Sequence, residues 1–326
     1  MSSIVTWLIP VKNGMPFLPF TLASIEAQTF KGFKVLAWND GSTDSSLLEL
    51  ERWIPGRIPG RVLSGHSIGV GAALNKLVAL ADTELCARID ADDVCRPDRL
   101  QKQVKFLEDH PEIALVGSNL RLIDEKGCPT GVFFDYPSDH ESITHALLAS
   151  NPIGHPSVLF RRRCVLGVGN YDSNAKLEDY DLWLRMASQY KLANIAEYLV
   201  DYRIHPNSAM RILEKEKKVK LLNEQTLEKH VTSLFGLSPA ELQRLREKGD
   251  TLAVARAWKM ARHLSRAQAS GALQRLRNPD LVKYFSSSTR RRDCISRLSF
   301  AFLAREPGSL RRELRGIARD LWATFA

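Results

Sequence analysis

The sequence predicts an α/β protein: a mostly parallel sheet flanked by helices over residues 1–210, then a basic helical region over residues 211–326. Short apolar runs alternate with helical patterns along the first part, as in βαβ units. The second part shows Arg-rich helical patterns without strands. Residues 1–210 hold 21 Lys and Arg against 25 Asp and Glu, whereas residues 211–326 hold 25 against 12. This change of charge places a domain boundary near residue 210.

The first two strands are expected at residues 4–9 and 32–38, where apolar side chains dominate. A proline opens the helical pattern at residues 16–28 between them. The second strand ends in the turn-rich sequence NDGSTD, whose Ser42, Thr43 and Asp44 can cap the next helix, residues 45–54.

The alternation continues through the following sixty residues. A helix is expected at residues 69–81 and a strand at residues 84–89. The next helix, residues 97–110, has Pro97 in its first turn, where a missing N–H costs little. Residues 113–117 read as a further strand. Strands and helices of these lengths favour a parallel sheet.

Composition excludes several classes of protein. The chain is 44% hydrophobic and 25% charged, as in ordinary soluble proteins, and no apolar run approaches the ~20 residues that span a membrane. The N-terminus has no basic stretch before its apolar residues, so we expect no signal peptide. The five cysteines are scattered without C-x-x-C spacing, which argues against disulfides and zinc. We therefore expect a cytoplasmic protein.

Acidic residues follow two of the predicted strands. Asp40 follows residues 32–38, and Asp90, Asp92 and Asp93 follow residues 84–89. Both loops should emerge at the carboxyl edge of the sheet, where open α/β folds bind ligands. The three clustered carboxylates either bind a hard cation such as Mg²⁺ or Mn²⁺ or form a solvated loop that caps a helix.

A second acidic group and two histidines are also candidates. Glu178 and Asp179 open a helical pattern. Carboxylates in the first turn of a helix are either stabilised by the helix dipole or include a general base. His155 and His205 precede prolines; each is either a packed or capping histidine or a functional group.

Five short motifs occur in a characteristic order: IPVKNG, NDGSTD, IDADDVCRPDRL, LEDYDLWLRM and YRIHPNS. Together they resemble the family 2 glycosyltransferases of the GT-A fold, over about residues 3–210. The resemblance implies an inverting transfer of sugar from a nucleotide-diphosphate sugar, most simply a UDP-sugar, to a hydroxyl of a glycan or lipid-linked acceptor. It also implies Mn²⁺ or Mg²⁺ as cofactor.

The resemblance assigns roles residue by residue. It makes Asp179 the general base with Glu178 as its neighbour. His155 is a candidate acceptor contact. The residues implied in nucleotide-sugar binding are Pro10, Val11, Lys12, Asn13, Asp40, Ser42, Asn75, Asp90 and Asp93. The implied metal ligands are Asp90, Asp92 and His205.

Two positions depart from the family pattern: Ser67 stands where an asparagine is frequent, and Lys12 where an aromatic is common. Acceptor specificity is expected from variable loops such as residues 127–155. Two other functions compete, a nucleotidyltransferase and a non-catalytic sugar-binding protein. A nucleotidyltransferase usually needs a Gly-rich phosphate loop near its N-terminus, where this chain is poor in glycine.

The basic C-terminal region has three interpretations. It is a solvated helical appendage, a peripheral membrane contact through the amphipathic helix at residues 309–325, or a nucleic-acid-binding region. No nucleic-acid motif is present, so no nucleic-acid partner is expected.

Overall fold

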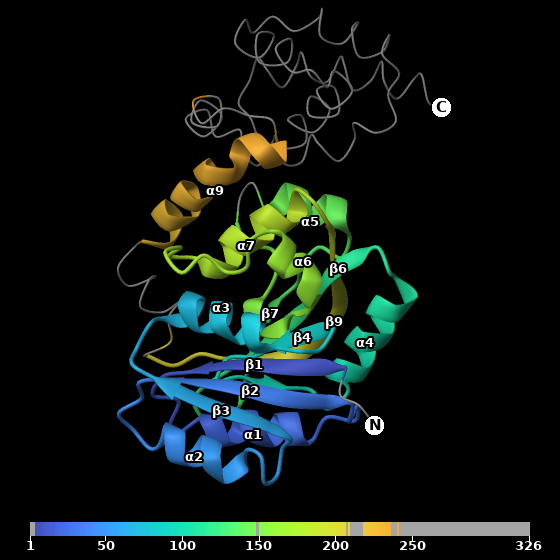
Figure 1. Ribbon diagram of the computed structural model, residues 1–326. Coiled ribbons are helices and arrows are strands. Elements are labelled where there is room, and N and C mark those ends of the chain that lie inside the picture. Colours follow the sequence, from blue (N-terminus) through green and yellow to red (C-terminus); the bar gives the residue numbers. More distant parts are fainter. Residues whose placement is uncertain (1–3, 148–149, 207, 209–217, 236–239, 241–326) are drawn as a thin grey trace, which may run out of the picture. The chain divides into compact units, whose positions relative to one another are not determined.

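A computed structural model describes residues 4–147, 150–206, 208, 218–235 and 240 (Figure 1). The chain divides into two compact units, one made of residues 1–143 and 151–226, the other of residues 144–150 and 227–326. The first unit holds the sheet. The predicted boundary near residue 210 and the amphipathic helix at residues 309–325 lie outside the described residues and stay predictions. Of the C-terminal region, the structure describes helix α9 (Val219–Phe235).

A nine-stranded sheet forms the centre of the first unit. Its order is β3-β2-β1-β4-β8-β6-β9-β5, and β7 pairs with β6. The strands are β1 (Val5–Val11), β2 (Phe33–Asp40), β3 (Gly60–Gly65), β4 (Leu85–Arg88), β5 (Val94–Cys95), β6 (Ile113–Ile123), β7 (Pro129–Phe134), β8 (Leu159–Arg161) and β9 (Lys191–Arg203). The first four run parallel to one another, as do β6 and β9. Strands β5, β7 and β8 are antiparallel to their neighbours.

Helices cover both faces of this sheet. Figure 1 shows α1 and α2 on one side of β1 to β3 and α3 on the other. The described helices before α9 are α1 (Leu18–Glu26), α2 (Ser46–Trp53), α3 (Val70–Leu80), α4 (Arg99–Asp109), α5 (His140–Ala146), α6 (Arg162–Gly167) and α7 (Glu178–Ala187), with a 3₁₀ turn, η1 (His155–Ser157). The predicted α/β class with a mostly parallel sheet is confirmed.

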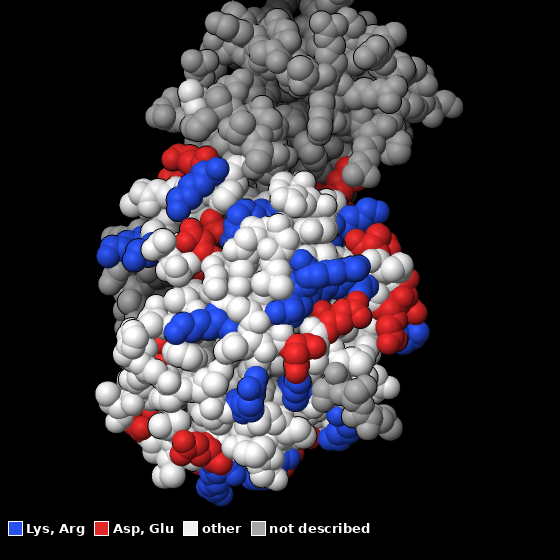
Figure 2. All heavy atoms as spheres, in the orientation of Figure 1, with Lys and Arg blue, Asp and Glu red and all other residues white. Residues whose placement is uncertain are grey.

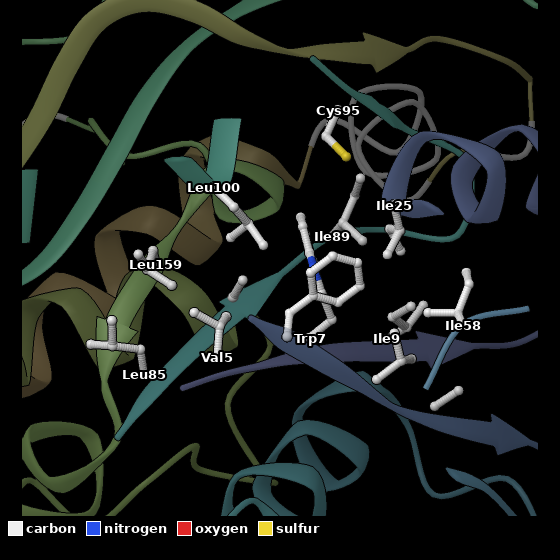
Figure 3. Packing of buried hydrophobic residues seen from close by; sticks show 14 of the residues in the cluster. Val5, Trp7, Ile9, Ile25, Ile58, Leu85, Ile89, Cys95, Leu100 and Leu159 are labelled. Carbon is white, nitrogen blue, oxygen red and sulfur yellow. The ribbon is translucent and has the colours of Figure 1, made fainter. Parts of the chain in front are cut away.

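Strand β1 shows why the centre of the sheet is apolar on both faces. Val5, Trp7 and Ile9 point into one core with residues of α1, α2 and α4 (Figure 3), while Leu8 is also fully buried. Successive side chains of a strand point to opposite faces, and a central parallel strand is covered on both. This burial explains why residues 4–9 are apolar on both faces of the strand, apart from the buried Thr6, rather than alternating.

The structure adds strands that the sequence pattern did not reveal. Strand β3 is short, half-exposed and bounded by glycines, and β8 has only three residues. Strand β6 continues to Ile123, six residues beyond its predicted end. The segment at residues 127–155, expected as variable loop, contains β7 and α5.

The close approach of β3 to β2 gives a stability prediction. A Cβ added to Gly60 would overlap the carbonyl oxygen of Val35. We expect Gly60→Ala to lower the free energy of unfolding by about 1–3 kcal/mol or more, measured by chemical denaturation. Gly56→Ala is the matched control, because the nearest atom to its Cβ would be 4.0 Å away. Equal stability of the two variants would contradict this prediction.

The described surface carries both signs of charge. Figure 2 shows Lys and Arg interspersed with Asp and Glu on the visible face of the described residues, in line with the nearly balanced composition of residues 1–210. Within the part of the chain that the structure describes, no helix has the length and apolar character needed to cross a membrane.

Candidate active site

The loops after β1 and β2 lie together at the carboxyl edge of the sheet. The backbone N–H of Asn13 donates to Ser42 Oγ at 3.0 Å, and the backbone N–H of Thr43 donates to Asn13 Oδ1 at 2.8 Å. Asn13 has a positive φ of 50°, a conformation that asparagine tolerates better than most residues. The structure thus brings Asn13, at the end of the segment from Pro10 to Asn13, against Ser42 and Thr43; their contact with a nucleotide stays a prediction.

Asp40 organises the neighbouring loop. Its Oδ1 accepts hydrogen bonds from Trp38 Nε1 and the Ile68 N–H, and its Oδ2 accepts from Ser67 Oγ and the Gly69 N–H. Burial alone would raise the pKa of Asp40, but these four hydrogen bonds lower it below its ordinary value. Both oxygens are thus engaged within the protein, and the contact of Asp40 with a nucleotide base stays a prediction.

The two departures from the family pattern contact each other. Lys12 Nζ donates to Ser67 Oγ at 2.9 Å, and Ser67 Oγ donates in turn to Asp40. Lys12 therefore lies at the carboxyl edge of the sheet, near Asp40, and its ammonium group has a partner within the protein. Asn75 lies on α3, where its Nδ2 donates to the carbonyl of Tyr171 at 2.6 Å; its predicted contact with the donor is untested.

Asp90, Asp92 and Asp93 form what we call the rim cluster. One carboxylate oxygen from each lies within 4.8 Å of the others. Asp90 is paired with the buried guanidinium of Arg88, and Asp92 Oδ2 lies 2.9 Å from His205 Nε2. The aspartates and His205 predicted as metal ligands are therefore neighbours in space.

Asp93 differs from its two neighbours because its side chain is fully buried. Its Oδ1 accepts from the backbone N–H of Arg203 at 2.8 Å, and its Oδ2 has no hydrogen-bond partner among the described residues. A buried carboxylate oxygen without a partner is costly. Asp93 is held inside the loop, and its predicted role at the donor sugar is untested.

The rim cluster concentrates negative charge. Burial raises the pKa of Asp90 to about 6, with the charges of Asp92 and Asp179 adding to the shift and Arg88 opposing it. Burial and the charges of Asp92 and Asp90 raise the pKa of Asp93 well above its ordinary value. Three crowded oxygen donors, one without a partner, fit a hard divalent cation, which would offset this repulsion.

Glu178, Asp179 and His155 form a second group, the helix cluster, at the start of α7. Their potential ligand atoms also lie within 4.8 Å of one another. Asn151 Nδ2 donates to Asp179 Oδ2 at 2.7 Å, and His155 Nε2 lies 3.0 Å from the hydroxyl of Tyr171. Asp179 is thus fixed in orientation.

The two carboxyl groups and the imidazole of the helix cluster are also poorly solvated. Burial and the charge of Asp179 raise the pKa of Glu178 to about 7, and burial raises that of Asp179. Burial, and next the charge of Arg88, lower the pKa of His155 well below its ordinary value, which makes its ring neutral at pH 7. The helix cluster therefore combines weakly acidic carboxyls with an uncharged imidazole.

Arg88 links the two clusters electrostatically. Burial tends to lower the pKa of Arg88, but the charges of Asp90, Tyr171 and Glu178 raise it overall. Asp90 and Glu178 also feel each other's charge. The charges of the rim cluster and of the helix cluster therefore act on Arg88 and on each other.

Sequence reasoning missed three residues of this site. Arg88 had a usable signal, since it lies two residues before Asp90 in an otherwise apolar strand and shares its face. Asn151, which holds Asp179, and Arg203, whose Nε donates to the carbonyl of Asp92 at 2.8 Å, gave none. Their contacts depend on segments 28 and 111 residues apart in the chain.

Comparison with known proteins identifies the family of the chain. Residues 6–165 match the family model "Glycosyl transferase family 2". The amylovoran biosynthesis glycosyltransferase AmsE of Erwinia amylovora is 30% identical over 184 residues, which are 56% of this chain and 68% of AmsE.

Two solved structures share the fold. The mannosyltransferase PcManGT of Pyrobaculum calidifontis, in complex with GDP-Man and Mn²⁺, has a TM-score of 0.57 at 16% identity and covers 94% of this chain and 89% of its own. S. aureus TarS 1–349, in complex with UDP-GlcNAc, has a TM-score of 0.54 at 15% identity and covers 99% and 92%. These similarities confirm the GT-A fold, and together with the sequence match they show that the chain belongs to glycosyl transferase family 2 and is a glycosyltransferase that uses a nucleotide-sugar donor.

Proposed function

We propose that the protein is an inverting enzyme that transfers a sugar from a nucleotide-diphosphate sugar to a hydroxyl of a glycan or lipid-linked glycan. The observation that carries this proposal is the presence of two carboxylate clusters at one site. An inverting displacement needs a base on the acceptor side and charge stabilisation on the leaving-group side. The helix cluster supplies the first and the rim cluster supplies the second.

Asp179 is the proposed general base. Asn151 holds one of its oxygens at 2.7 Å, and the backbone N–H of Tyr180 donates to the other at 2.7 Å. These bonds fix the carboxylate while leaving lone pairs for an acceptor hydroxyl. Its raised pKa makes it a better proton acceptor than an exposed aspartate.

Asp90 and Asp92 are the proposed holders of the cation, with His205 beside Asp92. Carboxylate oxygens suit Mn²⁺ and Mg²⁺, and an imidazole in the set favours Mn²⁺. Such an ion, when bound, stabilises the negative charge of the leaving diphosphate. Arg88 keeps Asp90 oriented through their ion pair.

The donor class has support from the comparisons. TarS was solved with UDP-GlcNAc and PcManGT with GDP-Man, both nucleoside-diphosphate sugars, and we retain a UDP-sugar as the proposed donor. AmsE acts in amylovoran biosynthesis, which supports a polysaccharide or lipid-linked glycan as acceptor. Family membership argues against the nucleotidyltransferase and non-catalytic alternatives. Peripheral membrane contact through residues 309–325 stays a prediction.

A donor panel tests the proposal. Purified protein is incubated with UDP-, GDP- and dTDP-sugars in the presence of Mn²⁺, and release of the nucleoside diphosphate is measured with and without EDTA. We expect release from one nucleotide class and its loss with EDTA. Absence of release from every donor, in the presence of mixed cell-envelope glycan extract as acceptor, would overturn the proposal.

A further inference from the structure

Strand β7 presents large apolar side chains to solvent. Val132, Phe133 and Phe134 are 49, 47 and 41% exposed. The strand pairs with β6 alone among the described strands, so its outer edge is open. Contiguous exposed apolar residues on a folded domain usually mark a binding surface.

The two phenylalanines lie on opposite faces of the strand. Phe134 is paired across the strands with Leu120, and Phe133 with Arg121. Directly opposite residues share a face of the sheet. Leu120 packs so closely on Gly154 that a Cβ there would lie 2.7 Å from Leu120 Cδ1. Phe134 therefore lies on the face that carries Gly154 and the adjacent helix cluster.

Phe133 belongs to the other face and has partners there. Its ring centroid lies 5.0 Å from that of Tyr198, and the hydroxyl of Tyr198 donates to Asp135 at 2.7 Å. Its cross-strand neighbour Arg121 is paired with Asp201. The two neighbouring phenylalanines thus differ in surroundings at nearly equal exposure.

The rings of Phe134 and Tyr136 stack on each other, and we call this pair the aromatic surface. Their rings are separated by 6.3 Å between centroids and inclined by only 21°. Tyr136 is the inner member, because it is half-buried whereas Phe134 is exposed. Burial, and next the negative charge of Asp179, raise the pKa of the Tyr136 hydroxyl. The surface therefore extends from the neighbourhood of the proposed base to solvent.

Hydrogen bonds and a short stretch of backbone connect this segment to the carboxylate of Asp179. Asn194 Nδ2 donates to the carbonyl of Pro137 at 2.8 Å and to that of Pro152 at 3.2 Å. Asn151, next to Pro152, donates to Asp179. The aromatic surface and the proposed base are therefore positioned by one connected network.

We propose that Phe134 and Tyr136 form an acceptor subsite, on which a sugar ring of the acceptor stacks with a hydroxyl directed toward Asp179. A pyranose ring has an apolar C–H face bounded by hydroxyls, which matches an aromatic surface with a polar group at its inner end. The inference rests on the proposed function, because it assigns Asp179 as the base. It identifies the part of the acceptor that receives the sugar as a saccharide ring rather than a lipid chain.

Steady-state kinetics of Phe134→Ala and Phe133→Ala test the subsite. The acceptors are p-nitrophenyl glycosides of glucose, galactose and N-acetylglucosamine, with the donor found by nucleotide release. We expect Phe134→Ala to raise the acceptor KM about tenfold with a smaller change in kcat, and Phe133→Ala to leave both within about twofold of wild type. Phe134→Trp should retain the wild-type KM, and Phe134→Leu, apolar but not flat, should not.

Saccharide binding measured by saturation-transfer NMR on the same glycosides makes the test independent of turnover. If wild type releases no nucleotide from any donor, the proposed function fails, and this binding experiment still decides the subsite. Equal effects of the two alanine variants, or a Phe134→Leu variant that behaves like wild type, would overturn it. A third result would also overturn the subsite. If both alanine variants lost binding to phosphatidylglycerol vesicles while their saccharide binding stayed unchanged, β7 would be identified as a lipid contact.

Discussion

Replacing Asp179 by asparagine is expected to lower kcat for sugar transfer by about 10²- to 10⁴-fold, the usual contribution of a positioned general base. Asparagine has nearly the same shape and still accepts a hydrogen bond from Asn151, but it cannot take a proton from an acceptor hydroxyl. The affinity for nucleoside diphosphate and Mn²⁺ should stay close to that of wild type, because the rim cluster is unchanged. Transfer is measured as product formation, and affinity by calorimetry.

Asp172→Asn is the control for this substitution. Asp172 lies in the loop before α7, and its Oδ1 accepts from the backbone N–H of Asn174, so the variant changes a nearby carboxylate outside the helix cluster. We expect its kcat within about twofold of wild type. Normal turnover by Asp179→Asn would show that the base lies elsewhere, and Glu178 would be the next candidate to replace.

The sequence predicted the acidic rim because parallel strands impose it. Once β2 and β4 are recognised as strands of one parallel sheet, Asp40 and the rim cluster must emerge at the same edge. The structure places both there. Only the resemblance to a family indicated that the acids at the start of α7 belong to the same site as the rim cluster. No local sequence pattern predicts that these two segments are neighbours.

The residues that orient the acids could not be found in this way. Asn151 acts on Asp179 through a loop, and its role depends on how η1 and α7 pack. Arg203 holds the loop of Asp92 and Asp93 from the end of β9, more than 100 residues along the chain. Hydrogen bonds between distant segments follow from tertiary packing, which no periodicity in the sequence encodes.

The hydrogen bond between Lys12 and Ser67, the two departures from the family pattern, is another contact that the sequence alone did not predict. Taken separately, each position only marks a difference from the family pattern. The structure shows that they form one hydrogen bond, so the lysine and the shorter serine accommodate each other. Ser67 also donates to Asp40, so the pair becomes part of the network that holds the turn after β2.

Replacing Asp92 by alanine is expected to weaken Mn²⁺-dependent binding of the donor nucleotide by at least about tenfold. Asp92 is part-buried, as is Asp90, whereas Asp93 is fully buried, and His205 lies 2.9 Å from Asp92. Its removal also deletes a negative charge that raises the pKa of Asp90 and Asp93. The fold should therefore be retained, with thermal stability equal to or above that of wild type in the absence of metal.

Calorimetry with UDP and GDP, each with Mn²⁺ and with EDTA, separates the role of Asp92 in metal binding from a general effect on the site. Asp98→Ala is the matched control, because Asp98 is an exposed aspartate six residues away that pairs with Lys102. In Mn²⁺ only Asp92→Ala should lose affinity. In EDTA all three proteins should bind equally weakly, since the interaction that Asp92 supports is then absent from each. A deficit of Asp92→Ala that persists in EDTA would mean that Asp92 contacts the nucleotide directly, and full affinity in Mn²⁺ would remove it from the set of metal ligands.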